Sequence, residues 1–413
     1  MIIIIDRNLQ VWVIMRPFKV PATEIERRSR NIQRLLQANS IDGLLIIQRV
    51  DLFYFSGTAQ NGFLFIPADG EPLLCIKRYL PRAQRESTLH NIVAIQSVKE
   101  LPERILDLYH RLPPTLGLEY DVLPVKEFEF YRHLFNGCQT VDGSSLVLDV
   151  RKVKSEWEIA QMEQTAEMSA RTFDYMQTAL RPGLSEMEFA GIYETYARKL
   201  GHGGKLRTRN YQSEAYPWHV LSGENGGRVG MLDAPFSGEG TSPAFPCGAG
   251  HRKIKPHEPI LVDFGAMLNG YHMDETRMFV IGKMPEKALQ ACNAAIDIHD
   301  MVLKKVRPGV TAGELFDHAV AAAVATGFED TFLGPPDQKV DFAGHGIGLE
   351  LIEPPYIARD KRDVLESGMT FALEPKFCYK GEFAAGIESV FQVTDCGSRL
   401  ISRVPARVFI CGQ

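Results

Sequence analysis

The stretch ILVDFGAMLNGYHMDETRMFVIG, residues 260–282, consists of two apolar runs joined by Asn269-Gly270. Asn-Gly between two such runs is the strongest short signal for a two-residue β-hairpin turn. With that turn, Asp263 lies opposite Thr276, and Asp274 lies two residues from Thr276 on the same strand. Side chains alternate between faces with a period of two, so both carboxylates and the threonine share one face of the hairpin.

Two carboxylates on one apolar face repel each other and lose hydration when buried, so a cation is expected between them. Three further ligand-type residues interrupt apolar segments: His345 in the glycine-flanked loop GHGIG, Glu374 in the strand TFALEP, and Glu388 in the strand GIESVFQV. Four carboxylates balance the charge of two divalent cations. One imidazole with four oxygen donors suits a pair of Mn, Fe, Co or Zn ions about 3.5–4 Å apart.

The rest of the chain divides into two parts by its patterns. Residues 20–150 alternate between an amphipathic helix, ATEIERRSRNIQRLLQA, and short strands such as GFLFIP and PLLCIK, which predicts an α/β domain. A long helix then begins at Ser155, which forms a predicted capping box with Glu158. We therefore expect a second domain over residues 151–413.

Two segments of equal length within this second domain share one pattern. They are RPGLSEMEFAGIYETYARKLG, residues 181–201, and RPGVTAGELFDHAVAAAVATG, residues 307–327. Each predicts a turn, a capping box (Ser185 with Glu188, Thr311 with Glu314) and a helix ended by glycine. The repeat indicates an internal duplication, and a cleft between the two halves is the expected place for a site.

Taken together, these motifs resemble the pita-bread metallohydrolases, the family of prolidase, aminopeptidase P, methionine aminopeptidase and creatinase. The segments LVDFG, GYHMDETR, GHGIG, ALEP and GIES carry the resemblance, which extends into the N-terminal domain. The family's ligand order matches Asp263, Asp274, His345, Glu374 and Glu388 position by position. The resemblance implies an α+β fold: an N-terminal α/β creatinase-type domain, then a duplicated pita-bread α+β domain with two divalent metals. It also implies a homodimer.

Several positions depart from the family around the substrate. Ile352 stands where prolidases carry a second histidine after the histidine-glycine motif, and Gly386 stands where many relatives carry an arginine. The histidine expected shortly after an SGxN segment is also absent after LSGENGG, residues 222–228, with His219 and His251 as substitutes. We predict that His219 and Ile352 contact the substrate, although a buried core histidine is the alternative for His219. The metal ligands are intact while the substrate contacts are altered.

The resulting hypothesis is a metal-dependent Xaa-Pro peptidase of the prolidase or aminopeptidase P type. The metals would activate a water molecule, and Glu374, a ligand, would also take its proton and pass it to the leaving nitrogen. Thr276 is predicted to hydrogen-bond a ligand carboxylate, with an ordinary β-branched strand residue as the alternative. Two other functions stay open: a creatinase-like amidinohydrolase or lyase acting on a small substrate, and a non-catalytic binding homologue.

Composition bears on partners and compartment. The 413 residues are 45% hydrophobic and 23% charged with a net charge of −5, which is typical of a soluble globular protein and unlike a nucleic-acid-binding or membrane-surface protein. The seven cysteines contain no CxxC pair, which predicts reduced thiols and a cytoplasmic location. Polar residues interrupt the apolar start MIIIIDRNLQVWVIM, so we expect an edge strand or an irregular N-terminus there rather than a signal peptide or membrane span.

Overall fold

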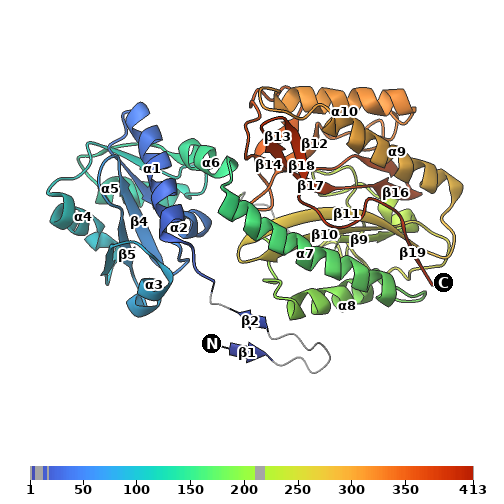
Figure 1. Cartoon of the computed structure of the whole chain (residues 1–413), viewed down its shortest axis with the longest axis horizontal. Helices are drawn as coiled ribbons and strands as arrows, with labels where there is room; N and C mark the ends of the chain where they lie inside the picture. Colours follow the sequence, from blue (N-terminus) through green and yellow to red (C-terminus); the bar gives the residue numbers. More distant parts are fainter. Residues whose placement is uncertain (1, 5–12, 16–17, 210–218, 413) are drawn as a thin grey trace. The chain divides into compact units, whose positions relative to one another are not determined.

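The computed structural model describes residues 2–4, 13–15, 18–209 and 219–412, and the chain divides into two compact units, residues 1–150 and 151–413 (Figure 1). At the N-terminus, β1 (Ile2–Ile4) and β2 (Val13–Met15) pair antiparallel. The remainder of the predicted edge strand lies outside the described residues.

The first unit is built on a six-stranded mixed sheet with the strand order β6-β5-β4-β3-β7-β8. Its elements are α1 (Ala22–Ala38), β3 (Gly43–Ile46), α2 (Arg49–Ser56), β4 (Gly62–Pro67), β5 (Leu73–Ile76), α3 (Leu80–Glu86), β6 (Asn91–Ala94), α4 (Leu101–Tyr109), β7 (Thr115–Leu118), α5 (Val125–Leu134), β8 (Gln139–Asp142) and α6 (Ser144–Lys152). Three strand pairs are parallel, β3–β7, β5–β6 and β7–β8. Parallel neighbours require crossover connections, which here contain helices, as an α/β pattern predicts.

The second unit carries the site residues. Its helices are α7 (Glu156–Ala179), α8 (Glu186–Lys199), α9 (Glu286–Leu303) and α10 (Ala312–Thr326). Its strands are β9 (His219–Ser222), β10 (Ile260–Leu268), β11 (Tyr271–Ile281), β12 (Phe342–Gly346), β13 (Glu353–Ala358), β14 (Thr370–Leu373), β15 (Lys376–Tyr379), β16 (Phe383–Gly386), β17 (Ser389–Thr394), β18 (Gly397–Leu400) and β19 (Phe409–Cys411).

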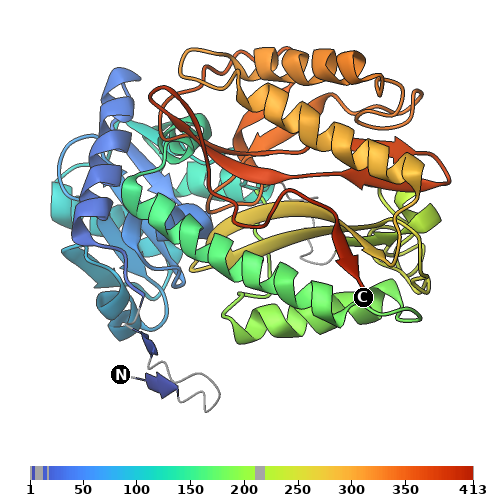
Figure 2. The same cartoon turned by 45° about the vertical axis from the view of Figure 1, so that its right-hand side comes forward.

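These strands form two sheets, β19-β11-β10-β9 and β13-β12-β14-β17-β18, with a further antiparallel pair β15-β16. In Figures 1 and 2, helices α7 and α8 lie on one side of the strands, and α9 and α10 lie on the other. The contacts agree, since α7 packs on β10 and β11, whereas α9 packs on β16 and α10 on β13. Asp263 pairs with Thr276 across β10 and β11, so the hairpin register predicted from Asn269-Gly270 is confirmed.

The two halves of the second unit repeat one another in their backbone hydrogen bonds. Both predicted helix starts have complete capping boxes, Ser185 with Glu188 and Thr311 with Glu314. Each helix start donates equivalent backbone hydrogen bonds to a facing extended segment. The matching pairs are Gly183 N–H to Ile254 O and Gly309 N–H to Leu365 O, Glu186 N–H to Arg252 O and Ala312 N–H to Asp363 O, and Met187 N–H to Gly250 O and Gly313 N–H to Lys361 O. Such matching of local geometry supports the predicted duplication.

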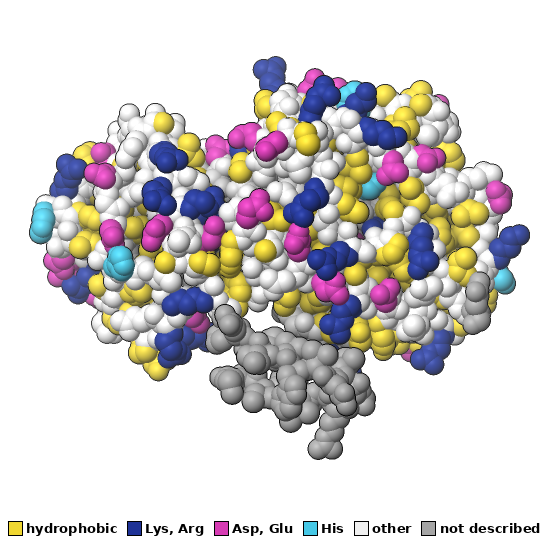
Figure 3. Space-filling model, in the orientation of Figure 1, with side chains coloured by type: hydrophobic (Ala, Val, Ile, Leu, Met, Phe, Trp, Pro, Cys, Tyr) yellow, Lys and Arg dark blue, Asp and Glu magenta, His cyan; other side chains and the backbone are white. Residues whose placement is uncertain are grey.

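The distribution of surface charge and the character of the helices are those expected from the composition. Acidic and basic side chains are interspersed on the face that Figure 3 shows. No helix within the described parts of the chain is long and apolar enough to span a bilayer.

Candidate metal centre and substrate cavity

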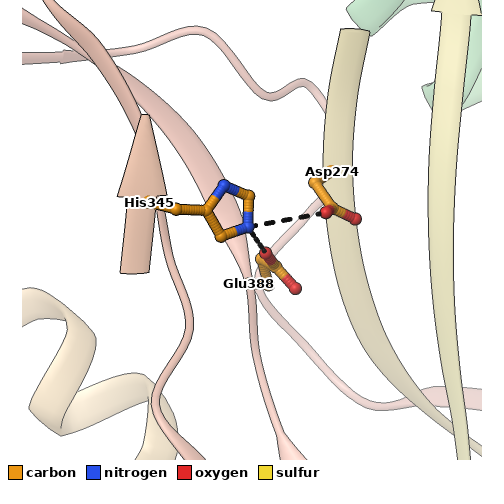
Figure 4. A group of neighbouring side chains, drawn as sticks. All are labelled: Asp274, His345 and Glu388. Carbon is orange, nitrogen blue, oxygen red and sulfur yellow. Dashed lines mark ion pairs between the residues drawn. The ribbon is translucent and has the colours of Figure 1, made fainter. Parts of the chain in front are cut away.

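The five predicted ligands come together at one cavity of the second unit. Asp263 lies on β10, Asp274 on β11 and His345 on β12, while Glu374 directly follows β14 and Glu388 directly precedes β17. Asp274, His345 and Glu388 each offer one ligand atom, and these atoms lie within 4.8 Å of one another (Figure 4). The two sheets therefore contribute to one centre, as the duplication predicts.

His345 lies on strand β12, so its predicted placement in a loop is wrong. The flanking glycines are needed because neighbouring strands approach closely. A Cβ at Gly344 would lie 2.2 Å from Ala372 O, and one at Gly346 would lie 2.3 Å from Pro354 O. The groups that approach these two glycines are therefore strand carbonyls.

We expect Gly344→Ala to lower the free energy of unfolding by about 1–3 kcal/mol, because the added methyl overlaps the Ala372 carbonyl. Gly191→Ala is the matched control: this helical glycine has nothing within 4 Å of an added Cβ, so the change should raise stability by about 0.5–1 kcal/mol. Urea denaturation of both variants measures the difference. Equal shifts would contradict the packing argument.

The imidazole of His345 is oriented for metal binding. Its Nδ1 lies 3.1 Å from Gly346 O, and because a carbonyl only accepts, Nδ1 carries the hydrogen and Nε2 presents a lone pair. That Nε2 lies 3.8 Å from Asp274 Oδ2, 3.7 Å from Glu374 Oε1 and 3.8 Å from Glu388 Oε1. These separations are too long for hydrogen bonds but suit donors that share one ion.

The two carboxylate oxygens of Glu388 differ in their hydrogen bonding. Thr276 Oγ1 donates to Glu388 Oε2 over 3.0 Å, which is the hydrogen bond expected of this threonine. Glu388 Oε1 is buried without a hydrogen-bond partner among the described residues. A buried carboxylate oxygen normally has a partner, so this orphaned acceptor next to His345 fits a cation ligand.

A lysine that sequence reasoning missed lies inside the centre. Lys376 Nζ lies 2.9 Å from Asp263 Oδ2, 2.8 Å from Glu374 Oε2 and 2.7 Å from Glu388 Oε2. Although burial alone would lower its pKa, the carboxylates hold the pKa of Lys376 well above its ordinary value. The available signal was its spacing, two residues after Glu374, because residues two apart in an extended chain point to the same face.

Arg277 is a second residue missed from the sequence. This buried guanidinium donates to Thr276 O over 2.8 Å and also to the backbone carbonyl of Glu388. It further donates to Ser389 Oγ, Val404 O and Pro405 O. Arg277 thus fixes the backbone at Glu388 against β11, although it lies outside the cavity lining.

The cavity next to these residues has a volume of about 790 Å³. Its wall includes the segment from Met231 to Phe236 and the side chains of Phe245, Leu351 and Tyr356. Ile352 also lines it and is 42% exposed, so its side chain is available to a ligand. Part of the segment after residue 228, which is rich in glycine and proline, therefore lines this cavity.

His219 lines the same cavity and pairs with Asp263 across β9 and β10. Its Nε2 lies 3.1 Å from Ser237 O, so Nε2 is the protonated nitrogen and Nδ1 is a hydrogen-bond acceptor. Burial lowers the pKa of His219 below its ordinary value, which favours the neutral ring. Both predicted substrate contacts, His219 and Ile352, thus line the same cavity as the predicted metal ligands.

Burial and neighbouring charges make metal binding by this centre pH-dependent. Burial and the Glu374 carboxylate raise the pKa of Glu388 to about 8, and burial and Glu388 raise the pKa of Asp274 well above its ordinary value. Below these values the metal-free carboxyls hold protons that a cation must displace.

We therefore expect the affinity for Mn²⁺ to increase as the pH rises toward about 8, by about tenfold per pH unit for each proton released. Calorimetry in two buffers of different ionisation enthalpy counts the protons. An affinity for Mn²⁺ that stays constant between pH 6 and pH 8, with no proton release, would contradict the raised pKa values of Glu388 and Asp274.

Residues 160–395 match the metallopeptidase family M24, and residues 28–153 match the Creatinase/Prolidase N-terminal domain. The chain belongs to metallopeptidase family M24. The resemblance to the pita-bread family and the predicted fold class, a creatinase-type domain followed by a pita-bread domain, are confirmed.

Similar proteins of this family cover nearly the same length. The chain is 24% identical over 381 residues to a Xaa-Pro dipeptidase of Pyrococcus furiosus, with 92% of this chain and 98% of that protein covered. A solved structure of a Xaa-Pro dipeptidase from Bacillus anthracis matches with a TM-score of 0.79 at 23% identity, covering 94% of this chain and 99% of that one. An X-Pro aminopeptidase from Thermotoga maritima matches with a TM-score of 0.77 at 24% identity, covering 92% and 99%. These structural likenesses show a shared fold.

Proposed function

We propose that this M24 family member is a divalent-metal-dependent peptidase that cleaves the Xaa-Pro bond of short peptides. The observation that carries the proposal is the set of four carboxylates and one imidazole at the cavity, with Glu388 Oε1 buried and unpaired among the described residues. A cavity of about 790 Å³ is of the size that binds small molecules. Relatives named Xaa-Pro dipeptidase or X-Pro aminopeptidase support the substrate class.

The donors on the His345 side would hold the cation: His345 itself with Asp274, Glu374 and Glu388. Three carboxylates and one imidazole suit Mn, Co, Fe or Zn, and the oxygen-rich set favours manganese. A divalent cation bound there supplies Lewis-acid activation of the scissile carbonyl and of a water molecule. All five side chains of a two-ion centre are present, and Lys376 pairs with the carboxylate of Asp263 at 2.9 Å.

Glu374 is the proposed proton carrier. One of its carboxylate oxygens faces His345, and the other accepts from Lys376 Nζ over 2.8 Å, which fixes its orientation. Glu374 takes the proton of the attacking water and delivers it to the leaving nitrogen. An amide nitrogen leaves as an amine only after it has gained a proton, so cleavage of the peptide bond depends on such delivery.

The cavity wall is proposed to position the peptide. Ile352 offers an apolar surface for the proline ring, and the neutral ring of His219 offers Nδ1 as an acceptor. The missing second histidine leaves a second candidate function, a creatinase-like amidinohydrolase or lyase acting on a small substrate. A binding homologue without catalysis ranks last because a binding module has no need for a complete set of metal ligands.

The decisive experiment is a panel of Xaa-Pro dipeptides and Xaa-Pro-containing tripeptides, assayed after reconstitution with Mn²⁺ or Co²⁺. Turnover of dipeptides alone supports a dipeptidase, and release of the first residue from tripeptides supports an aminopeptidase. Absence of turnover on every peptide, with turnover of an amidine or a small zwitterion, would replace the first function with the second.

We also propose a cytoplasmic homodimer. All seven cysteines are free, which supports a reducing compartment. The homodimer rests on the family resemblance alone. Light scattering coupled to gel filtration measures the mass in solution against 46.3 kDa for one chain.

A further inference from the structure

The Lys376 ammonium fills the Asp263 side of the centre. Its distances to Asp263 Oδ2, Glu374 Oε2 and Glu388 Oε2 are 2.9, 2.8 and 2.7 Å. An ammonium has three N–H donors, and these three oxygens use all of them. A fully coordinated cation among three carboxylates performs the neutralisation that a metal ion would perform at this position.

Glu374 and Glu388 each have a second carboxylate oxygen, which lies on the His345 side of the centre. Glu374 Oε1 and Glu388 Oε1 lie 3.7 and 3.8 Å from His345 Nε2. Asp274 Oδ2 lies 3.8 Å from the same nitrogen. Two ligands bound about 2.1 Å from a tetrahedral ion lie about 3.4 Å apart, so these four donors surround a position for one ion.

Gly386 provides the space for the lysine stem. It is the direct partner of Lys376 across β15 and β16. A Cβ at Gly386 would lie 2.7 Å from Lys376 Cγ and 3.1 Å from Lys376 Cα. The glycine at this position, noted from the sequence as a departure from the family, is therefore a requirement of the buried lysine, and the two residues act as a pair.

We propose that Lys376 takes the place of one of the two divalent ions, so that the centre binds a single divalent cation on its His345 side. A second divalent ion would need the carboxylate oxygens that the Lys376 ammonium occupies. The ion and the ammonium would also repel each other. Four carboxylates give −4, so Lys376 with one divalent ion leaves −1 and Lys376 with two leaves +1; the occupied oxygens, rather than the net charge, favour one ion. The inference rests on the proposed function in requiring a bound metal at all.

The test counts the ions bound by the full-length protein. Wild-type, Lys376→Met and the control Lys380→Met are loaded with excess Mn²⁺ and desalted, and manganese is measured by mass spectrometry. Lys380 is an exposed lysine near the same hairpin that pairs with Asp337. We expect one ion per chain in the wild type and in Lys380→Met, and two in Lys376→Met. Electron paramagnetic resonance should show an isolated Mn²⁺ ion in the wild type and an exchange-coupled pair in Lys376→Met.

Asp263→Asn provides a second measurement if Lys376→Met does not fold. In a one-ion centre the ion is bound without Asp263, whose carboxylate pairs with Lys376 at 2.9 Å, so this variant should retain one ion. Two coupled ions in the wild type, or one ion in both the wild type and Lys376→Met, would overturn the role of Lys376. No ion in any variant would overturn the metal dependence itself. Because ion counting does not depend on turnover, failure of the peptide panel is a separate result.

Discussion

Glu374→Gln is expected to lower kcat on a Xaa-Pro peptide by about 10²–10⁴-fold, because the amide cannot carry the proton from water to the leaving nitrogen. The amide oxygen can still accept from Lys376, which lies 2.8 Å from Glu374 Oε2, so the local structure should persist. The measurement is kcat at saturating Mn²⁺, with the manganese content of the variant determined in parallel.

The matched control for this variant is Glu382→Gln. Glu382 is an exposed glutamate between β15 and β16 that pairs with Lys287, away from the cavity. It should leave kcat and metal content unchanged. A Glu374→Gln enzyme that keeps its metal and its full turnover would remove Glu374 from the mechanism, whereas loss of metal together with turnover would reduce its role to that of a ligand.

Glu353→Ala is expected to lower the free energy of unfolding by about 3–5 kcal/mol, because it removes the carboxylate that two buried cations share. Glu353 forms ion pairs with Arg151 and with Lys154, the latter at 2.7 Å, and all three side chains are buried. Burial acts to raise the pKa of Glu353, but Lys154 and Arg151 outweigh it and hold the pKa below its ordinary value. In the variant Arg151 retains Glu350 at 2.9 Å.

The measurement is thermal or urea denaturation at constant metal loading, with Asp341→Ala as the control. Asp341 forms an ion pair with Arg359 at 2.8 Å, but its side chain is 71% exposed. Exposed pairs contribute about 0–1 kcal/mol, so the control should change stability little. A Glu353→Ala shift as small as that of the control would show that this buried network contributes nothing to the stability of the fold.

Features that depend on neighbours in the chain were predicted well. The hairpin register that places Asp263 opposite Thr276 follows from one Asn-Gly turn and the alternation of side chains. The helix starts at Ser155, Ser185 and Thr311 follow from capping boxes that span only four residues. Acidic side chains are unusual in apolar strands, and this local signal, together with the family resemblance, predicted the four carboxylate ligands.

Features that depend on contacts distant in sequence were missed or misplaced. His345 was placed in a loop because its glycines are typical of loops, whereas the close approach of the Ala372 carbonyl requires Gly344 within a strand. Nothing in the local pattern indicates that Arg151 is paired with Glu353, because the partners lie 202 positions apart.

The sequence by itself predicted the candidate metal ligands, because residue type, turn and period are local properties. Only the tertiary structure decided how their charge is neutralised. Lys376 joins Asp263, which lies 113 positions earlier, to Glu374 and Glu388. The space opposite Lys376 exists because Gly386 is its cross-strand partner. Electrostatic energy depends on distance in space, so an ammonium among three carboxylates becomes visible only when the strands are assembled.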